Sequence, residues 1–144
     1  MAETIQVQAT YDAAMRFDIH SSGGHTVRLD GEHAAGYSPM EMLLASLAGC
    51  SGMSVISILR KKQEAITHYE VHVQGTRAET HPLVFVEITV EHLITGHSVR
   101  PQSVERAIEL AETRYCGVSI MLRQATRLTH TYRIQEAEEP LPQA

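Results

Sequence analysis

Alternation of apolar and polar residues predicts strands near the start of the chain. Residues 4–11 alternate in this way, with the period of two that is typical of a half-buried strand. Residues 15–20 and 25–29 are two further candidate strands, and the Ser-Ser-Gly-Gly sequence at 21–24 is typical of a hairpin turn. Residues 1–37 are therefore predicted to hold three strands and a loop.

The next stretch, residues 38–63, is apolar on nearly every side and carries no charge between Glu41 and Arg60. Ser38 and Pro39 form a favoured helix start, a capping residue followed by proline at the first helical position. Three consecutive cations at the other end suit a helix C-terminus. Such a helix is predicted to be buried on every side. Its length would also span a bilayer, but its small residues and four internal serines favour tight packing inside a soluble protein.

The second half of the chain predicts a pair of strands, two helices and a last strand. Residues 66–95 contain two long alternating segments, which we expect to pair antiparallel around His81-Pro82. Residues 101–125 read as helices interrupted at Tyr115-Cys116, and residues 126–135 alternate again. This order of elements predicts one α+β domain.

Composition and charge narrow the class of protein. A net charge of -5 and the absence of a long basic run give no reason to expect a nucleic-acid partner. The N-terminus shows neither the basic nor the apolar region of a signal peptide, so we expect a cytoplasmic protein without a membrane partner. In that compartment two cysteines are more often reactive or inert than joined in a structural disulfide.

The two cysteines are the leading candidates for chemistry. Cys50 lies inside the apolar helix, where a thiol is most often an inert small hydrophobe. Cys116 lies at the break between two predicted helices, and a helix N-terminus there would lower the pKa of its thiol. The two thiols could form a redox couple, in which Cys50 is oxidised to a sulfenic acid and Cys116 resolves it to a disulfide. No short spacing ties the two together.

Nine histidines raise the question of a metal site. His68 and His72 point to one face of a predicted strand, but Glu70 and Gln74 share that face, which we therefore expect to be solvated. The remaining histidines show no ligand spacing: they are His20, His25, His33, His81, His92, His97 and His130. We expect neither a metal nor a cofactor.

Glu41 and Arg28 each have a simple structural explanation. Glu41 lies in the first turn of the predicted helix, where an acid suits the helix dipole. It is nine residues from Cys50, which at about 100° per residue places it on the opposite side of a straight helix. It would meet that thiol only across a kink or from another chain. Arg28 lies in a predicted strand, where most arginines are exposed.

Three stretches of the sequence resemble the OsmC/Ohr family. Residues 38–50 and 55–61 resemble its first cysteine helix, residues 112–122 resemble its second cysteine segment, and residues 129–132 resemble its closing strand. The resemblance covers nearly the whole chain, and the two cysteine motifs have the expected separation. Within the family the sequence is most similar to the YhfA-like branch, whose members mostly have no assigned activity.

The resemblance implies an intertwined homodimer, with antiparallel sheets wrapped around two central cysteine-bearing helices. It also implies thiol-dependent reduction of organic hydroperoxides or hydrogen peroxide in oxidative-stress defence, with an external dithiol as reductant. Cys50 matches the peroxidatic cysteine and Cys116 the resolving one. In the family an arginine and a glutamate hold the reactive thiol. Arg28 resembles the arginine, and Glu41 is the candidate glutamate.

Two departures from the family pattern affect this site. An ungapped alignment on Pro39 and Cys50 places Met40, rather than Glu41, at the glutamate position. Methionine cannot pair with an arginine, and Glu41 is about 100° away around the helix. Gly117 stands where the peroxidase branches often have proline. The thiol pair is therefore kept while the groups expected to activate it are altered.

Three functions follow, in order of preference. The first is a thiol peroxidase in which Cys50 attacks the peroxide and Arg28 stabilises the thiolate, with organic hydroperoxides favoured by the apolar helix. The second is a non-catalytic dimer that binds a small apolar or electrophilic ligand near Cys50. The third is a metal site made by Cys50, Cys116 and a histidine.

Overall fold

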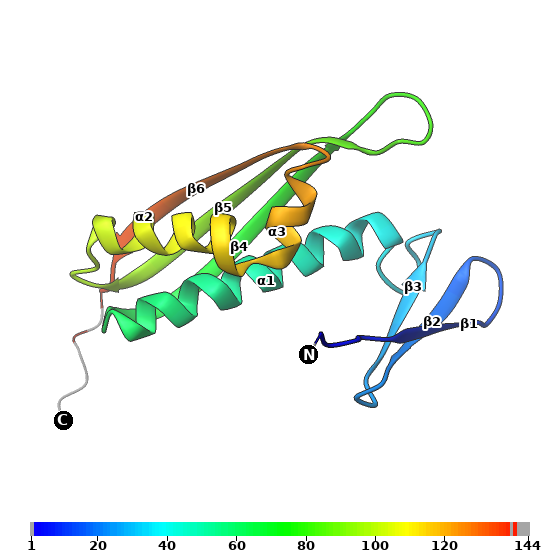
Figure 1. Ribbon diagram of the computed structural model, residues 1–144, viewed down its shortest axis with the longest axis horizontal. Helices are drawn as coiled ribbons and strands as arrows, with labels where there is room; N and C mark the ends of the chain where they lie inside the picture. Colours follow the sequence, from blue (N-terminus) through cyan, green and yellow to red (C-terminus); the bar gives the residue numbers. More distant parts are fainter. Residues whose placement is uncertain (1, 139, 141–144) are drawn as a thin grey trace. The chain divides into compact units, whose positions relative to one another are not determined.

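The computed structural model of the protein describes residues 2–138 and 140. These residues form two compact units divided between Leu43 and Leu44, and each unit contains one three-stranded sheet (Figure 1). The long helix α1 (Pro39–Lys61) contributes its first turn to the first unit and its remainder to the second. The α+β class predicted from the order of elements is confirmed.

The first unit is an antiparallel meander of three short strands in the order β1-β2-β3. The strands are β1 (Val7–Tyr11), β2 (Arg16–Ser21) and β3 (Thr26–Asp30). All three were predicted, although β1 begins three residues later than the alternation suggested. Gly24 has a φ of 87° in the predicted hairpin turn, a left-handed conformation that glycine adopts without strain.

One face of this meander is apolar and uncovered. Residues that pair directly across strands share a face, and the register pairs Tyr11 with Phe17 and Ile19 with Val27. The exposed fractions are 69% for Val7, 59% for Tyr11, 41% for Phe17 and 40% for Val27. Large apolar side chains at this exposure on one face call for a covering partner.

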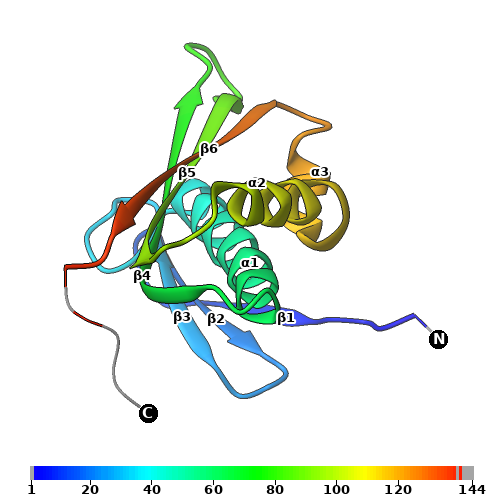
Figure 2. The same cartoon turned by 90° about the vertical axis from the view of Figure 1, so that its left-hand side faces the viewer.

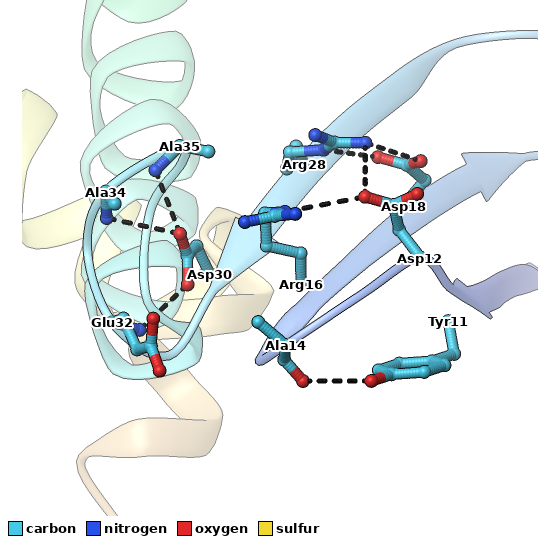
Figure 3. Close-up of polar contacts among 10 residues, drawn as sticks. All are labelled: Tyr11, Asp12, Ala14, Arg16, Asp18, Arg28, Asp30, Glu32, Ala34 and Ala35. Carbon is cyan, nitrogen blue, oxygen red and sulfur yellow. Dashed lines mark hydrogen bonds and ion pairs between the residues drawn. The ribbon is translucent and has the colours of Figure 1, made fainter.

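A buried carboxylate organises the loop that follows β3. Asp30 is 1% exposed, and its two oxygens accept hydrogen bonds from the backbone N–H groups of Glu32 at 2.8 Å, Ala34 at 3.2 Å and Ala35 at 2.9 Å (Figure 3). These bonds lower the pKa of Asp30, the bond from Glu32 being the largest cause. The loop therefore enters α1 with a fixed conformation.

The second unit packs helices against one face of a three-stranded sheet. Figures 1 and 2 show α1 and α2 side by side on that face. In chain order after α1, the elements are β4 (Ala65–Arg77), β5 (Phe85–His97), α2 (Pro101–Leu110), the π-helical turn η1 (Ala111–Tyr115), α3 (Gly117–Leu122) and β6 (Arg127–Glu136).

The sheet of the second unit is mixed, in the order β4-β5-β6. β4 and β5 pair antiparallel, as predicted, but β5 and β6 pair parallel. The expectation of antiparallel sheets is therefore wrong for this one. The reason is the connection: α2, η1 and α3 form a crossover that returns the chain to the same end of the sheet, and parallel strands require such a connection.

The core of the second unit lies between the sheet and the helices. Alternate residues of β5, from Ile88 to Ile94, are buried on the face that the helices cover. The buried cluster contains Val55, Leu59, Ile94, Val99, Val104, Ala107, Ile108 and Ala111. Burial of these apolar side chains is the main source of the unit's stability.

Only one stripe of α1 is buried within the chain. Leu47, Ser51, Val55 and Leu59, spaced four residues apart, are fully buried, whereas Met53 is 74% exposed. The expectation of burial on every side is therefore wrong for a single chain, because the sheet and α2 cover one side only. In the described part of the chain, α1 alone is long and apolar enough to cross a bilayer by length and composition, and its buried stripe belongs to the core.

Candidate active site

The structure brings the two cysteines together in the second unit. Cys50 is half-buried on α1, and Cys116 is fully buried between η1 and α3. Both thiols are free, and the Cys50 thiol lies near enough to the Cys116 thiol to contribute to the raised pKa of Cys116. Two sulfurs from distant parts of the sequence therefore share one site.

The position of Cys116 depends on a π-helical turn. The helix α2 ends at Leu110 and widens into η1, after which Cys116 adopts an extended conformation with φ −89° and ψ 95°. The Cys116 N–H donates to the carbonyl of Ala111 at 2.8 Å, five residues back. π-helical turns of this kind are frequent at functional sites. The predicted break at Tyr115-Cys116 is confirmed, and it turns the Cys116 side chain toward α1.

The Cys116 sulfur lies among uncharged partners. It accepts a hydrogen bond from the Ser119 N–H at 3.3 Å, and it is 3.5 Å from Ser51 Oγ, the neighbour of Cys50. Burial raises the pKa of the Cys116 thiol, and the neighbouring Cys50 thiol raises it further, while the bonds from Ser51 and Ser119 lower it. The expectation of a lowered pKa is therefore wrong, because burial outweighs the two donors.

A chain of hydrogen bonds leads from this site into the sheet. Tyr69 Oη is 2.6 Å from His92 Nδ1, His92 Nε2 is 3.0 Å from His130 Nδ1, and His130 Nε2 is 3.2 Å from Ser119 Oγ. The two imidazole rings stack with their centroids 5.3 Å apart. The chain joins β4, β5, β6 and α3 through side chains alone.

His92 and His130, the two histidines in this series of hydrogen bonds, are buried and neutral at pH 7. His92 is 0% exposed and the His130 side chain 1%. Burial lowers the pKa of His92 from 6.5 to about 4, with a further contribution from His130, and burial also lowers the pKa of His130 to about 4. Glu112 Oε2 is 3.8 Å from His130 Nε2, and burial raises the pKa of that carboxyl.

Sequence reasoning missed these two histidines because it looked only for metal-ligand spacing. A usable signal was present at His92, which occupies a buried position of β5 between Val90 and Ile94. A histidine where the alternation calls for an apolar residue indicates a buried polar partner. His130, its partner on β6, could not be paired with it before the parallel register was known.

Arg28 is bound to two aspartates inside the first unit. Its Nε and Nη2 donate to Asp18 at 2.9 and 3.1 Å, and Nη2 is 3.4 Å from Asp12 (Figure 3). The hydrogen bond from Arg28 is the largest cause of the lowered pKa of Asp18. Arg28 pairs with Asp18 across β2 and β3, and it therefore lies on the polar face of the meander.

Glu41 completes the N-terminal cap of α1. The Glu41 N–H donates to Ser38 Oγ at 3.2 Å, and the Ser38 N–H donates back to Glu41 Oε1 at 3.1 Å. This reciprocal pair is a capping box, which Ser-x-x-Glu predicts from sequence. His33 Nδ1 lies 2.7 Å from the same oxygen. The Ser38 N–H, then His33, lowers the pKa of Glu41.

The described residues contain no metal centre. His68 and His72 are exposed and both bond to Glu70, at 2.8 and 3.0 Å, on the solvated face that was predicted. Within residues 2–138 and 140, no group of three His, Cys, Asp or Glu side chains could hold a metal ion. The proposed site of Cys50, Cys116 and a histidine is therefore not formed there.

Comparisons with family models, curated proteins and solved structures each find similar proteins. A family model described as OsmC-like protein matches residues 30–131. Protein YhfA of Escherichia coli strain K12 is 33% identical over 134 residues, which are 92% of this chain and 100% of that protein. The crystal structure of a hypothetical protein from Aquifex aeolicus VF5 is 28% identical, with a TM-score of 0.87, and the match covers 95% of this chain and 100% of that one.

A more distant structure shares the fold. The organic hydroperoxide resistance protein OhrB of Bacillus subtilis is 18% identical, with a TM-score of 0.61, and the match covers 91% of this chain and 98% of that one. The arrangement of two sheets and helices is therefore the α+β fold of the OsmC and organic hydroperoxide resistance proteins.

The buried histidines predict a loss of stability in mild acid. Each histidine binds a proton near pH 6.5 in the unfolded chain but only near pH 4 in the folded one. Stability is therefore complete above pH 6.5 and falls as the pH drops toward 4, by about 3 kcal/mol for His92 alone. Urea unfolding between pH 7 and pH 4, at fixed protein concentration, measures this loss.

The variant His92→Gln, which cannot take up a proton, should show a flatter dependence of unfolding free energy on pH. His25→Gln is the matched control, because His25 is exposed in the β2–β3 turn. Identical pH dependence in His92→Gln and the parent protein would contradict the assignment of a neutral buried His92.

Proposed function

Because the chain belongs to the OsmC-like protein family, we propose that it is a thiol peroxidase that reduces organic hydroperoxides through Cys50 and Cys116. The observation that carries this proposal is the proximity of two free thiols. Cys116 Sγ lies 3.5 Å from Ser51 Oγ, on the residue next to Cys50, and the Cys50 thiol contributes to the raised pKa of Cys116. Fold neighbours named as organic hydroperoxide resistance proteins support the substrate class and a role in oxidative-stress defence.

The proposed reaction has three steps that balance. The Cys50 thiolate attacks the terminal oxygen of the hydroperoxide, the O–O bond breaks, the alcohol leaves after gaining a proton, and Cys50 becomes a sulfenic acid. The Cys116 sulfur then attacks the Cys50 sulfur, and the departing hydroxide takes the Cys116 proton and leaves as water. An external dithiol reduces the resulting disulfide and is itself oxidised to a disulfide.

The surroundings of the thiols suit an organic substrate. The helix α1 carries no charge between Glu41 and Arg60. The helix surface next to Cys50 therefore has no charged side chain to bind a small polar peroxide. Burial raises the pKa of the Cys116 thiol and so favours its protonated form. Hydrogen peroxide is therefore expected to be the poorer substrate.

Turnover of cumene hydroperoxide with dithiothreitol tests this function. We expect the parent protein to consume the peroxide and Cys50→Ser to be inactive, because the attacking sulfur is gone. Cys116→Ser should form the Cys50 sulfenic acid but no internal disulfide, which mass spectrometry of the intact protein detects. Ser57→Ala, at an exposed position of the same helix, is the matched control.

Equal turnover by the parent protein and Cys50→Ser would refute the peroxidase. Absence of turnover together with a co-purified apolar ligand would instead identify the non-catalytic binding protein, the second of the three functions inferred from sequence.

We further propose that Arg28 stabilises the Cys50 thiolate and that Glu41 orients Arg28. Arg28 is already paired with Asp18 and Asp12, and Glu41 with Ser38 and His33. Each group therefore has to exchange or share a partner to reach a thiol. This exchange of partners is consistent with Met40 standing at the position of the family's glutamate. It predicts slower oxidation of Cys50 than in a site where the arginine and the glutamate have no other partners.

The contribution of Arg28 is measurable as the rate constant of Cys50 oxidation. We expect Arg28→Gln to lower it at least about tenfold, because a cation favours the reactive thiolate. Arg16→Gln is the matched control, since Arg16 also pairs with Asp12. Stopped-flow mixing with one equivalent of cumene hydroperoxide gives the rate. An unchanged rate in Arg28→Gln would remove Arg28 from the site.

A second copy of the chain is the proposed partner of the two uncovered apolar surfaces. The meander face that contains Val7, Tyr11 and Phe17 and the exposed side of α1 at Met53 both leave large apolar groups in water. A 144-residue chain with this much exposed apolar surface is expected to bury it by association. The implied homodimer of the family is consistent with both surfaces.

Sedimentation velocity tests the dimer. We expect the parent protein to sediment as a dimer and Phe17→Glu to shift it toward monomer, because a charge would be buried in an apolar interface. His20→Glu is the matched control: it adds the same charge to the opposite face of the same strand. A monomeric parent protein would exclude the dimer.

A further inference from the structure

Ser119 connects the second thiol to the buried histidines. Its backbone N–H donates to Cys116 Sγ at 3.3 Å, and its hydroxyl meets His130 Nε2 at 3.2 Å. Ser119 is 0% exposed, so the hydroxyl has no access to water. Loss of His130 would leave this hydroxyl buried without that partner, which costs free energy that a small rotation of α3 can recover.

The direction of the hydrogen bonds along the chain can be assigned. The Glu112 carboxylate, 3.8 Å away, favours a proton on His130 Nε2. His130 then donates to Ser119 Oγ and accepts from His92 at Nδ1, so His92 carries its proton on Nε2 and accepts from the Tyr69 hydroxyl. Every link in this assignment has one donor and one acceptor, with both imidazoles neutral.

We propose that His130 is a positioning residue for Cys116. Anchored by His92 and Tyr69 to the sheet, it fixes Ser119 and the first turn of α3, so that the Ser119 N–H points at the Cys116 sulfur. This role rests on the proposed peroxidase, in which Cys116 closes the disulfide. The N–H bond favours the thiolate over the thiol, and the same bond holds the sulfur toward Cys50.

Among the described residues, the groups in polar contact with His130 are His92 on β5, Glu112 on η1 and Ser119 on α3. Ser119 also contacts the Cys116 thiol. Burial raises the pKa of the Glu112 carboxyl, and the charge of Arg123 offsets part of that rise. A change at His130 should therefore affect Cys116 and Glu112 and leave the attack of Cys50 on the peroxide unaffected.

Two measurements on three variants test the proposal. In a Cys50→Ser background, ¹³Cβ NMR of labelled cysteine gives the ionisation constant of Cys116, which we expect His130→Ala to lower about tenfold, as loss of one hydrogen bond to a charged group implies. In the Cys50 protein, His130→Ala should slow disulfide formation about tenfold while dimedone-trapped sulfenic acid forms at the parent rate. His130→Gln, whose amide can donate to Ser119, should restore both values.

Ser119→Ala is the third variant, and it should reproduce His130→Ala without a further effect in the double variant, because both remove the same bond. Val104→Ala, a buried truncation in the α2 core, is the control for loss of stability alone. An unchanged Cys116 ionisation constant in His130→Ala, an equal change in Val104→Ala, or failure of His130→Gln to restore it would each overturn the proposal. Absence of sulfenic acid in the parent protein would refute the peroxidase, while the NMR measurement still decides the role of His130.

Discussion

The parallel pairing of β5 with β6 is the constraint on which the site depends. Parallel neighbours cannot be joined by a hairpin, so the chain must cross the sheet through α2, η1 and α3. This crossover lies on the face that α1 also covers, and its irregular turn carries Cys116 to Cys50. The same pairing places His130 of β6 beneath α3, within reach of Ser119. The pair of thiols and the hydrogen-bonded histidines therefore both follow from the parallel pairing of β5 with β6.

Burial is the dominant physical effect on the Cys116 thiol and the two histidines behind it. It raises the pKa of Cys116 and lowers those of His92 and His130, which leaves all three groups uncharged at neutral pH. A protonated Cys116 can give its proton to the hydroxide that departs from the oxidised partner, while the Ser119 N–H bond favours the anionic sulfur that attacks. Uncharged surroundings are also less suitable for a peroxidatic thiol, which reacts as the anion. Both steps of the proposed reaction therefore need an anionic sulfur in surroundings that favour the thiol.

Local sequence patterns allowed most of the helices and strands to be predicted. The direction and register in which β6 pairs could not be predicted from them. Alternation located all six strands, and Ser38-Pro39 located the start of α1. The function of Glu41 in the cap was also readable, since Ser-x-x-Glu is a local motif. The direction of β6 was not, because alternation has no polarity. His92 and His130, 38 residues apart in sequence, could be joined only through that missing register.

The same distinction separates the two steps of the proposed reaction. Disulfide closure uses only groups of the second unit: both sulfurs, Ser119 and the histidines behind it. Activation of Cys50 by Arg28 and Glu41 is the proposal, and in the first unit each of these two groups is held by local partners. On this proposal, we expect a change at Met40 to act on the activation step and to leave the closure step intact. On the same proposal, a branch of the family can alter the reactivity of its first thiol while it keeps the pair, because the pair belongs to the second unit and the proposed activating groups are held by polar contacts within the first.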